Sequence, residues 1–458
     1  MQDRIDRAQL PPGVLKLSRK LASAGYEAWI VGGCIRDLLL GRAASDWDVA
    51  TNATPTQVQR CFRRVVPTGI QHGTVTVLDG SESYEVTTFR GDGSYSDGRR
   101  PDRVHFVDQI DADLARRDYT VNAIAYDPIH DRFADPFDGR RDLLQKTLRT
   151  VGVPTERFGE DGLRILRGAR FCATLDFELE SETEAAFEGA LANFRRVSRE
   201  RVRDEWLKAM KSNKPSKAFE VMRRTGILEI TLPELLDQCG CEQNRHHAFD
   251  VWTHTMRTLD LCDASPTERM AALLHDIGKP QARARSEKTG DWTFHNHESI
   301  GAQMADRWLR DYRFSSDERA QIVHLVRHHL ICYTPEWSDA AVRRFLQRVG
   351  PTHIEPLLRL ARADVLAKGR PVDQELDALQ ELRLRIEQER SANSALNVQD
   401  LAINGKDVMR ALGSRGGPEV GRALRFLLDC VVERPELNER EDLLRTLTSA
   451  DPSRFGLK

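Results

Sequence analysis

Residues 45–53 read SDWDVATNA, and shortly before them residues 30–37 read IVGGCIRD. In the first stretch Asp46 and Asp48 flank a tryptophan, and the pattern DWDVAT predicts a strand. Because side chains alternate along a strand, both carboxylates are expected on the same side. Two like charges so close together repel unless a cation lies between them. The stretch therefore predicts a divalent-metal site on a strand.

Two glycines, Gly32 and Gly33, stand between a β-like run, AWIV, and a helical pattern, CIRDLLLG. Glycines at such a junction let backbone amides approach a phosphate, and a helix N-terminus adds partial positive charge. Arg36, in the first turn of this helix, opposes the helix dipole and is expected to face an anion. Metal-bridged carboxylates beside a phosphate cradle are what two-metal nucleotidyl transfer requires. From these residues alone, aspartates that merely cap a turn remain an equal alternative.

The chain of 458 residues is expected to form several domains, because it is too long for one core. The first part mixes strand and helix patterns, and GTVTVLD and SYEVTTFR alternate like paired strands joined by the turn DGSE. From TERFGEDG onward helical spacing continues to the end. No apolar run is long enough to cross a bilayer, so no membrane partner is expected. The N-terminal segment lacks an export signal and the eight cysteines are scattered, which favours a cytoplasmic location.

Charged residues recur in two later stretches of the chain. DLARRDYTVNAIAYDP places three of them ahead of an apolar strand: Arg116, Arg117 and Asp118. FGEDGLRILRGARF places four polar residues three positions apart, which predicts that one side of a helix carries Asp161, Arg164, Arg167 and Arg170. Three arginines on one stripe repel each other, and phosphates or a base edge would relieve that repulsion. Both stretches therefore indicate an anionic ligand.

With these stretches the sequence resembles the class II tRNA nucleotidyltransferases, or CCA-adding enzymes, and their poly(A) polymerase relatives. The matching pieces are VGGCIRD, DWDVAT, TGIQHGTVTV, EVTTFRGDGSYSDGRRPDRVHF, LARRDYTVNAIAYDP and EDGLRILRGARF, in family order over about the first 175 residues. The resemblance implies an α+β fold: a polymerase-β-like mixed-sheet head followed by an all-α neck and body and a helical tail. It also implies tRNA, CTP and ATP as partners, and addition of CCA, or of its last residue, to tRNA 3′ ends.

The resemblance assigns roles to the residues named above. Asp46 and Asp48 would hold Mg²⁺ as the catalytic pair. The nucleotide-binding set would be Gly32, Gly33, Arg36, Arg116, Arg117, Asp118, Asp161, Arg164, Arg167 and Arg170. Asp161 and Arg164 would read the base, since a carboxylate and a guanidinium match the amino group and ring nitrogen of both C and A. U and G present a carbonyl beside an N–H, so both contacts would be reversed.

The resemblance leaves subtypes open. The glycine-rich loop ahead of RRPD, which enzymes that add only CC are said to shorten, looks full length, and this disfavours addition of CC alone. Addition of the terminal A alone and poly(A) synthesis remain alternatives. A rival of another class is a phosphohydrolase whose head only binds RNA, and a third is an RNA-binding scaffold without activity.

Nine of the thirteen histidines fall between residues 246 and 329, and imidazoles beside carboxylates are typical divalent-metal ligands. The segments resemble the HD superfamily of metal-dependent phosphohydrolases over about 247–366. That resemblance implies a site for one or two ions (Ni²⁺, Mn²⁺ or Mg²⁺) with the ligands His254, His275, Asp276, His297, His329 and Asp364. The close alternates are His247, His295 and His328. Phosphatase and 2′,3′-cyclic phosphodiesterase activity in tRNA end repair is implied, and a domain that only shapes the tRNA-binding surface is the alternative.

The overall net charge of −2 does not indicate a nucleic-acid partner, but its distribution does. Residues 189–224 hold eleven Lys and Arg against four Asp and Glu. We expect this stretch to hold the tRNA acceptor arm through Arg195, Arg196 and Arg199, although a solvated helical face is the alternative. The expected domains are a head (1–150), a neck and body (151–240), an HD domain (241–370) and a helical tail (371–458). The sequence does not give the oligomeric state.

Overall fold

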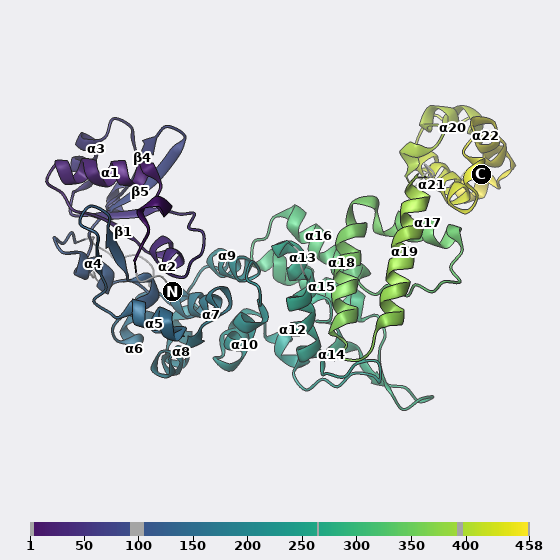
Figure 1. Cartoon of the computed structure of the whole chain (residues 1–458). Coiled ribbons are helices and arrows are strands. Elements are labelled where there is room, and N and C mark those ends of the chain that lie inside the picture. The colour runs from purple at the N-terminus through teal and green to yellow at the C-terminus, as the bar shows by residue number, and fades with distance from the viewer. Residues whose placement is uncertain (1–3, 92–104, 263–264, 392–396, 457–458) are drawn as a thin grey trace. The chain divides into compact units, whose positions relative to one another are not determined.

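A computed structural model describes the chain in four stretches: residues 4–91, 105–262, 265–391 and 397–456 (Figure 1). The glycine-rich loop before RRPD lies outside the described residues, apart from its first glycine. The chain divides into two compact units, one formed by Met1–Leu236 with Asp311–Arg313 and the other by Asp237–Arg310 with Phe314–Lys458. The expected division into four domains remains a prediction.

The first unit contains a mixed seven-stranded sheet in the order β3-β4-β5-β2-β1-β6-β7. Its β2 and β5 run parallel, and the other neighbours run antiparallel. A parallel pair needs a crossover, which α3 and the β3–β4 hairpin supply here. The strands are β1 Ala28–Val31, β2 Asp48–Thr51, β3 Val65–Gly69, β4 Thr74–Asp79, β5 Glu82–Thr88, β6 Ala125–Asp127 and β7 Arg132–Ala134.

The predicted hairpin of β4 and β5 is confirmed, with Asp79 opposite Glu82 across a two-residue turn. The predicted strand DWDVAT is shorter than expected, because β2 begins only at Asp48. Asp46 therefore precedes the strand, and the alternation that was to place it beside Asp48 does not apply.

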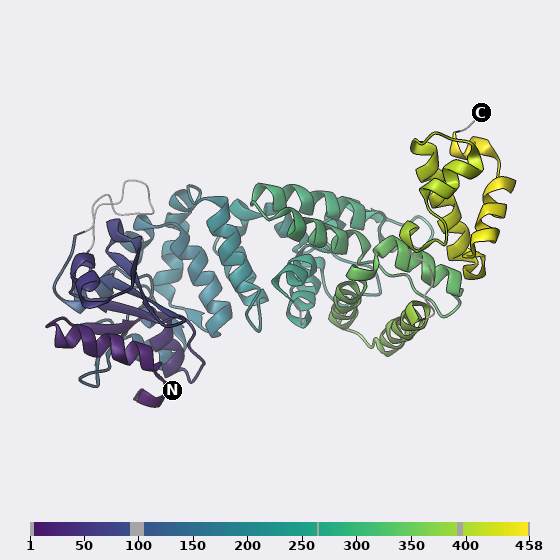
Figure 2. The same cartoon turned by 90° about the horizontal axis from the view of Figure 1, so that it is seen from above.

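Helices cover the sheet and continue beyond it. Figure 2 shows α1, the purple helix, lying along the sheet. The buried core between sheet and helices includes Trp29, Phe89 and Leu114. The helices of this unit are α1 Pro12–Ser23, α2 Gly33–Leu39, α3 Pro55–Cys61, α4 Ile110–Ala115, α5 Gly139–Gln145, α6 Pro154–Glu160, α7 Leu163–Leu175, α8 Ser181–Phe194, α9 Arg199–Ala209, α10 Ser216–Arg224 and α11 Ile227–Thr231.

The single helix expected to carry Asp161 with the three arginines is broken. Asp161 has extended backbone angles (φ −145°, ψ 108°) and ends α6, whereas α7 begins two residues later. Gly162 lies so close to the end of α8 that a Cβ would stand 2.6 Å from the backbone nitrogen of Phe194. Glycine weakens a helix and permits this approach, so the break follows from packing that the spacing rule does not contain.

Among the described residues of the second unit, the only strands form a hairpin of β10 Arg283–Arg285 and β11 Trp292–Phe294, and the other regular elements are helices. This hairpin, and a short parallel pair in the first unit (β8 Thr147–Leu148 with β9 Glu178–Leu179), depart from the purely helical continuation that was expected. The overall class, a mixed-sheet head with helical remainder, is confirmed. The helices are α12 Val251–Leu261, α13 Pro266–Leu274, α14 Lys279–Ala282, α15 His297–Asp311, α16 Ser316–His328, α17 Asp339–Val349, α18 Ile354–Ala367, α19 Asp373–Ser391, α20 Gly405–Leu412, α21 Pro418–Glu433 and α22 Arg440–Ser449.

The last helices close a small core of their own, which includes Val408, Leu427 and Leu443. Within the four described stretches, none of the helices combines the length and apolar character that a bilayer span requires.

Candidate functional site

A cavity of about 600 Å³ in the first unit gathers most of the predicted site residues. Its volume falls within the usual range for small-molecule sites, roughly 300 to 1,000 Å³. Asp46 is not among the lining residues. The predicted residues that do line the cavity are Gly32, Gly33, Arg36, Asp48, Arg116, Arg117, Asp118, Asp161, Arg164, Arg167 and Arg170.

Asp48 is the first residue of β2 and lines this cavity. Its partner in the parallel register is Glu85 of β5, which also lines the cavity. Partial burial raises the pKa of Asp48, and the charges of Glu85 and Asp46 raise it further. Mutual repulsion among three carboxylates is relieved by a bound cation, so these residues fit a divalent metal. Sequence reasoning missed Glu85 because the parallel pairing is not visible in the sequence.

The junction between β1 and α2 brings backbone close to Asp48. Gly32 has φ +82°, which favours glycine, and a Cβ there would stand 3.0 Å from a guanidinium nitrogen of Arg117. The two glycines therefore leave room at the cavity wall, as a phosphate cradle requires. The helix that follows, α2, has only seven residues, so its dipole adds little positive charge at the cavity wall.

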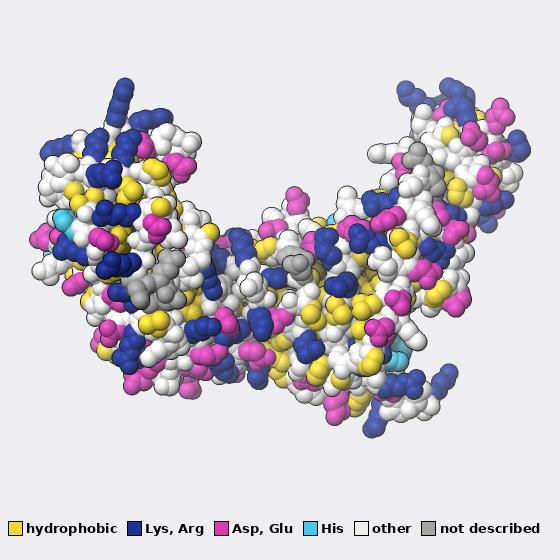
Figure 3. All heavy atoms as spheres, in the orientation of Figure 1, with side chains coloured by type: hydrophobic (Ala, Val, Ile, Leu, Met, Phe, Trp, Pro, Cys, Tyr) yellow, Lys and Arg dark blue, Asp and Glu magenta, His cyan; other side chains and the backbone are white. Residues whose placement is uncertain are grey.

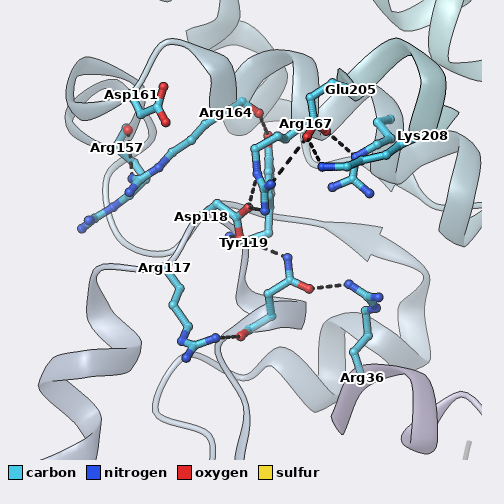
Figure 4. Close-up of polar contacts among 12 residues, drawn as sticks. Arg36, Arg117, Asp118, Tyr119, Arg157, Asp161, Arg164, Arg167, Glu205 and Lys208 are labelled. Carbon is cyan, nitrogen blue, oxygen red and sulfur yellow. Dashed lines mark hydrogen bonds and ion pairs between the residues drawn. The ribbon is translucent and has the colours of Figure 1, made fainter. Parts of the chain in front are cut away.

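Arg36 lines the cavity but already has partners within the protein. Its guanidinium lies 2.9 Å from the carboxylate of Asp37 and donates to the side-chain carbonyl of Asn122 at 2.6 Å. Arg36 therefore does face an anion, the carboxylate of Asp37, and its expected contact with a ligand phosphate stays a prediction. These contacts hold the guanidinium in place at the cavity wall, and Figure 4 marks the hydrogen bond to Asn122 with a dashed line.

The arginines of α7 are also paired within the protein, which corrects the inference that their mutual repulsion requires a phosphate. Figure 4 shows Arg167 between the acidic side chains of Asp118 and Glu205. The three ion pairs are Arg164 with Glu160 (2.7 Å), Arg167 with Asp118 (2.6 Å) and Arg170 with Glu205 (2.5 Å). Burial opposes the ionisation of Asp118, but Arg167 and Asn122 outweigh it and lower the pKa of Asp118.

The two residues expected to read the base are both held in place. Arg164 donates to the backbone oxygens of Arg157 and Arg116, at 3.0 and 3.1 Å. Asp161 accepts a 2.9 Å bond from the backbone N–H of Leu163 and a 2.5 Å bond from Arg201 of α9. A carboxylate has about four lone-pair sites, so Asp161 can still accept from a base. Arg201, 40 positions away in sequence, was not predicted.

The basic stretch 189–224 is less cationic than its composition indicates. Arg199 pairs with Asp311 at 3.0 Å, whereas Arg195 and Arg196 are exposed and have no side-chain partner among the described residues. Within the same stretch, carboxylates lie within 4 Å of Arg201, Arg203, Lys208, Lys217, Arg223 and Arg224.

In the second unit, all six histidine and aspartate residues of the predicted metal site come together. Their ligand atoms form three overlapping groups, each of which spans less than 4.8 Å. Three ligands follow helices, one begins a helix and two lie within helices. The positions are His254 on α12, His275 and Asp276 after α13, His297 at the start of α15, His329 after α16 and Asp364 on α18.

These residues fit a metal ion. The Nδ1 atoms of His275, His297 and His329 each lie 2.7 Å from a backbone carbonyl, which fixes the tautomer and leaves Nε2 for a metal. The Nε2 atom of His275 and the Oδ1 atom of Asp276 are buried without a hydrogen bond among the described residues, whereas Oδ2 of Asp276 lies 2.6 Å from the Lys279 ammonium. Burial lowers the pKa of His254, which favours the neutral imidazole that metals bind.

The three alternative metal ligands, His247, His295 and His328, lie in different surroundings. His247 shares a group with His254 and Asp364, and burial lowers the pKa of His247 to about 3. His295 is exposed at the mouth of the adjoining cavity. His328 instead stacks against His324, with ring centroids 4.5 Å apart. That cavity, of about 320 Å³, is also lined by Trp292, Phe294, Leu330 and Lys279.

Three family models match successive parts of the chain. A poly(A) polymerase head domain matches residues 28–149. A probable RNA- and SrmB-binding site of polymerase A matches 176–239, and an HD domain matches 251–369.

Similar proteins are known from several bacteria. The CCA-adding enzyme of Listeria monocytogenes serotype 4b (strain CLIP80459) is 44% identical over 246 residues, 54% of this chain and 61% of that protein. The chain thus matches about three fifths of the length of such relatives. The CCA-adding enzyme of Streptococcus suis (strain 05ZYH33) is 30% identical over 442 residues, 94% of both chains.

The fold is similar to solved structures over nearly the whole chain. The Bacillus stearothermophilus CCA-adding enzyme in complex with CTP is 28% identical and superposes with a TM-score of 0.74 over 97% of this chain and 99% of that one. The Thermotoga maritima CCA-adding enzyme complexed with tRNA has the same fold at 19% identity, with a TM-score of 0.55 over 98% and 99% of the two chains.

Proposed function

Because the chain belongs to the family of CCA-adding enzymes, the class II tRNA nucleotidyltransferases, we propose that it adds CCA to tRNA 3′ ends from CTP and ATP. The observation that carries this proposal is one cavity that holds Asp48 beside Glu85, two glycines, and the Asp161–Arg164 pair. Carboxylates at one end and base-reading groups at the other are what a template-independent transferase needs.

In this proposal the chain's own residues orient the nucleotide. Arg117 and Arg36 contact the triphosphate, and the backbone of Gly32 and Gly33 allows the phosphates to approach. Asp161 accepts from the amino group of C or A, and Arg164 donates to the neighbouring ring nitrogen. Because both are held by protein contacts before a nucleotide binds, little ordering energy is needed for selection.

Asp48, with Asp46 and Glu85 near it, would hold Mg²⁺ in this site. When bound, the ion activates the attacking 3′ hydroxyl and stabilises charge on the departing pyrophosphate. The carboxylates would supply the negative charge that holds the ion.

The test of this function uses two RNAs and single nucleotides. The protein is incubated with tRNA that ends at the discriminator base and with tRNA that ends in CC, with each NTP separately. Addition of C to the first and of A to the second supports CCA addition. Addition of A alone to the second indicates an A-adding enzyme, and long A tracts on either RNA indicate a poly(A) polymerase.

A control separates the transferase from a protein whose head only binds RNA. The double variant Asp46→Ala and Asp48→Ala loses transfer if the carboxylates act as proposed. Transfer by this variant at the parental rate would contradict the proposal.

For the second unit we propose a metal-dependent phosphohydrolase that removes 2′,3′-cyclic phosphate or phosphate from damaged tRNA ends. The buried, hydrogen-bond-free Nε2 of His275 and the carboxylate of Asp276 favour this activity over a merely structural domain. A bound Ni²⁺, Mn²⁺ or Mg²⁺ would polarise the phosphate and activate water. Lys279, 2.6 Å from Asp276, lies where it can contact a phosphate oxygen.

This activity is tested by hydrolysis of 2′,3′-cAMP with and without added Ni²⁺ or Mn²⁺. Asp276→Asn is expected to abolish hydrolysis and to leave nucleotide addition to tRNA unchanged, because the two sites lie in separate units. Hydrolysis that survives this substitution would refute the assignment.

A further inference from the structure

The cavity of about 600 Å³ that holds Asp48 is called the transfer cavity below. A second cavity in the first unit, of about 280 Å³, lies on the opposite face of the sheet. Val77 and Tyr84 are register partners on β4 and β5, and both line this second cavity. Thr74 and Thr87, partners three positions further along the same strands, line the transfer cavity instead. The two pairs are offset by three positions along each strand. Because side chains alternate along a strand, an odd offset places them on opposite faces of the sheet.

The rim of the second cavity is strongly cationic. Lys16 and Lys20 come from one side of α1, and Arg63 and Arg64 from the segment between α3 and β3. Lys16 pairs with Asp79, the one lining carboxylate, at 2.7 Å. In the stretches that the structure describes, the other three cations have no carboxylate partner. Figure 3 shows dark-blue side chains gathered around α1 and α3, with hydrophobic atoms between them.

The floor of the cavity holds a polar group. Tyr84 as a whole residue is only 3% exposed, and its hydroxyl has no hydrogen-bond partner among the described residues. A Cβ on Gly13 of α1 would stand 2.3 Å from this hydroxyl, so a glycine is required for the ring to reach its position. Burial raises the pKa of Tyr84, which keeps the hydroxyl protonated and able to donate. A hydroxyl that lines a cavity and has no partner in the protein is available to donate a hydrogen bond to an acceptor on a ligand.

The rest of the cavity wall is apolar. Leu17 and Val77 are 2% exposed, and the ring of Phe62 stands beside them at the rim, 5.0 Å from the Lys20 ammonium. A ligand that satisfies this wall and the three unpaired cations carries several negative charges and a flat, largely apolar part.

We propose that this cavity is a binding site for a nucleoside phosphate, separate from the transfer site. The phosphates contact Lys20, Arg63 and Arg64 and accept from the Tyr84 hydroxyl, and the base lies against Phe62 and Leu17. Tyr84 is adjacent in sequence to Glu85, the partner of Asp48, so β5 carries residues of both sites.

The location is tested by photolabelling the full-length protein with 8-azido-ATP and mapping the labelled peptides. Label is expected on peptides that contain Leu17 or Phe62, in addition to any label in the transfer cavity. Unlabelled ATP is expected to protect these peptides at lower concentration than inorganic pyrophosphate, which has no base. Absence of label there while the transfer cavity is labelled, or equal protection by the two competitors, would overturn the proposal.

Charge reversal provides the matched control. Lys20→Glu with Arg64→Glu is expected to reduce this label about tenfold without reducing label in the transfer cavity. Arg19→Glu changes an exposed neighbour on α1 that does not line the cavity, and is expected to keep the label. Equal loss in both variants would indicate a general surface charge effect and no site.

Tyr84→Phe separates a ligand role from a structural one. Because the hydroxyl lacks a partner in the protein, its removal is expected to leave the midpoint of thermal unfolding unchanged or raised, yet to reduce label about fivefold. A lowered midpoint with unchanged label would overturn the role of the hydroxyl. A protein that labels here but adds no nucleotide to tRNA would refute the proposed transferase function alone.

Discussion

The carboxylate of Asp161 accepts a 2.5 Å hydrogen bond from the guanidinium of Arg201, although the two residues lie on different helical segments. This contact fixes the direction of the carboxylate as an acceptor. Arg201→Ala is expected to lower the preference for CTP over UTP about tenfold, because a freely rotating Asp161 discriminates less well.

Single-nucleotide kinetics on tRNA that lacks CCA measure this preference. Arg201→Lys keeps the charge but not the rigid fork, and is expected to fall between the parent and the alanine variant. An unchanged ratio of kcat/KM for CTP and UTP in Arg201→Ala would show that Asp161 needs no support from α9.

Glu85 adds a third carboxylate to Asp48 and Asp46, and its removal should weaken binding of the metal ion. Glu85→Gln is expected to raise the Mg²⁺ concentration for half-maximal transfer about tenfold, because less negative charge attracts the ion. Titration of activity with Mg²⁺ measures this value. Glu82→Gln, at the exposed start of the same strand, is the control and should leave the Mg²⁺ dependence as it is in the parent.

The Asp118–Arg167 pair is expected to stabilise the head in a pH-dependent way. The folded-state pKa of Asp118 is lowered, so its contribution is complete above the unfolded-state pKa of about 4 and is lost as the pH falls through the folded-state value. Asp118→Asn should therefore reduce the free energy of unfolding by about 3 kcal/mol at neutral pH, and by less in acid.

Urea unfolding at several pH values measures that difference. Asp204→Asn removes an exposed partner of Arg203 and should cost no more than about 0.5 kcal/mol at any pH. A difference between parent and Asp118→Asn that stays constant down to pH of about 2 would contradict the linkage to Asp118 ionisation.

Arg195 and Arg196 are the exposed arginines of the basic stretch without a partner, so their loss should weaken tRNA binding most. Reversal of both charges is expected to lower affinity and to reduce the slope of log K against log salt by about 1 to 2. Arg223→Glu, on a helix where Glu220 already pairs with the arginine, is the control. Equal salt slopes for the parent and the double variant would remove these arginines from the interface.

Trp292 forms part of the cavity wall beside the histidine site, and its indole is held by Arg283, 3.7 Å from the ring centroid, and by Glu242. An aromatic wall beside a phosphohydrolase site is expected to stack on a base. Trp292→Ala should raise KM for 2′,3′-cAMP about tenfold and leave hydrolysis of glycerol 2-phosphate, which has no base, unchanged.

Recovery of the parental KM for 2′,3′-cAMP in Trp292→Phe would indicate that the aromatic ring stacks on the base. Binding of adenosine 2′-monophosphate to the metal-free protein gives an independent readout of the same contact. Equal loss on both substrates would indicate a folding defect of the hairpin.

The features that could be predicted from the sequence are those that depend on residue types close together along the chain. The alternation in GTVTVLD and SYEVTTFR predicted the hairpin, and the density of histidines beside His275 and Asp276 predicted a metal site whose six residues do lie together. Both features depend on residue type and short spacing, which a sequence displays directly.

Features that depend on distant segments could not be predicted. Glu85 reaches Asp48 only through the parallel pairing of β2 with β5, and Arg201 reaches Asp161 only through the packing of α9. The acids that neutralise the arginines of α7 likewise come from three elements of the fold. The break before α7 follows from the contact of Gly162 with the end of α8.

The two-residue turn at Gly80 and Ser81 sets which face of the head each residue of β5 serves. A single inserted residue there would shift β5 by one position and exchange its inward and outward side chains. Glu85 would then leave the face that lines the transfer cavity and Tyr84 would enter it, so one inserted residue would remove a lining residue from each of the two cavities. The length of this turn is therefore as much a part of the head's chemistry as any charged side chain.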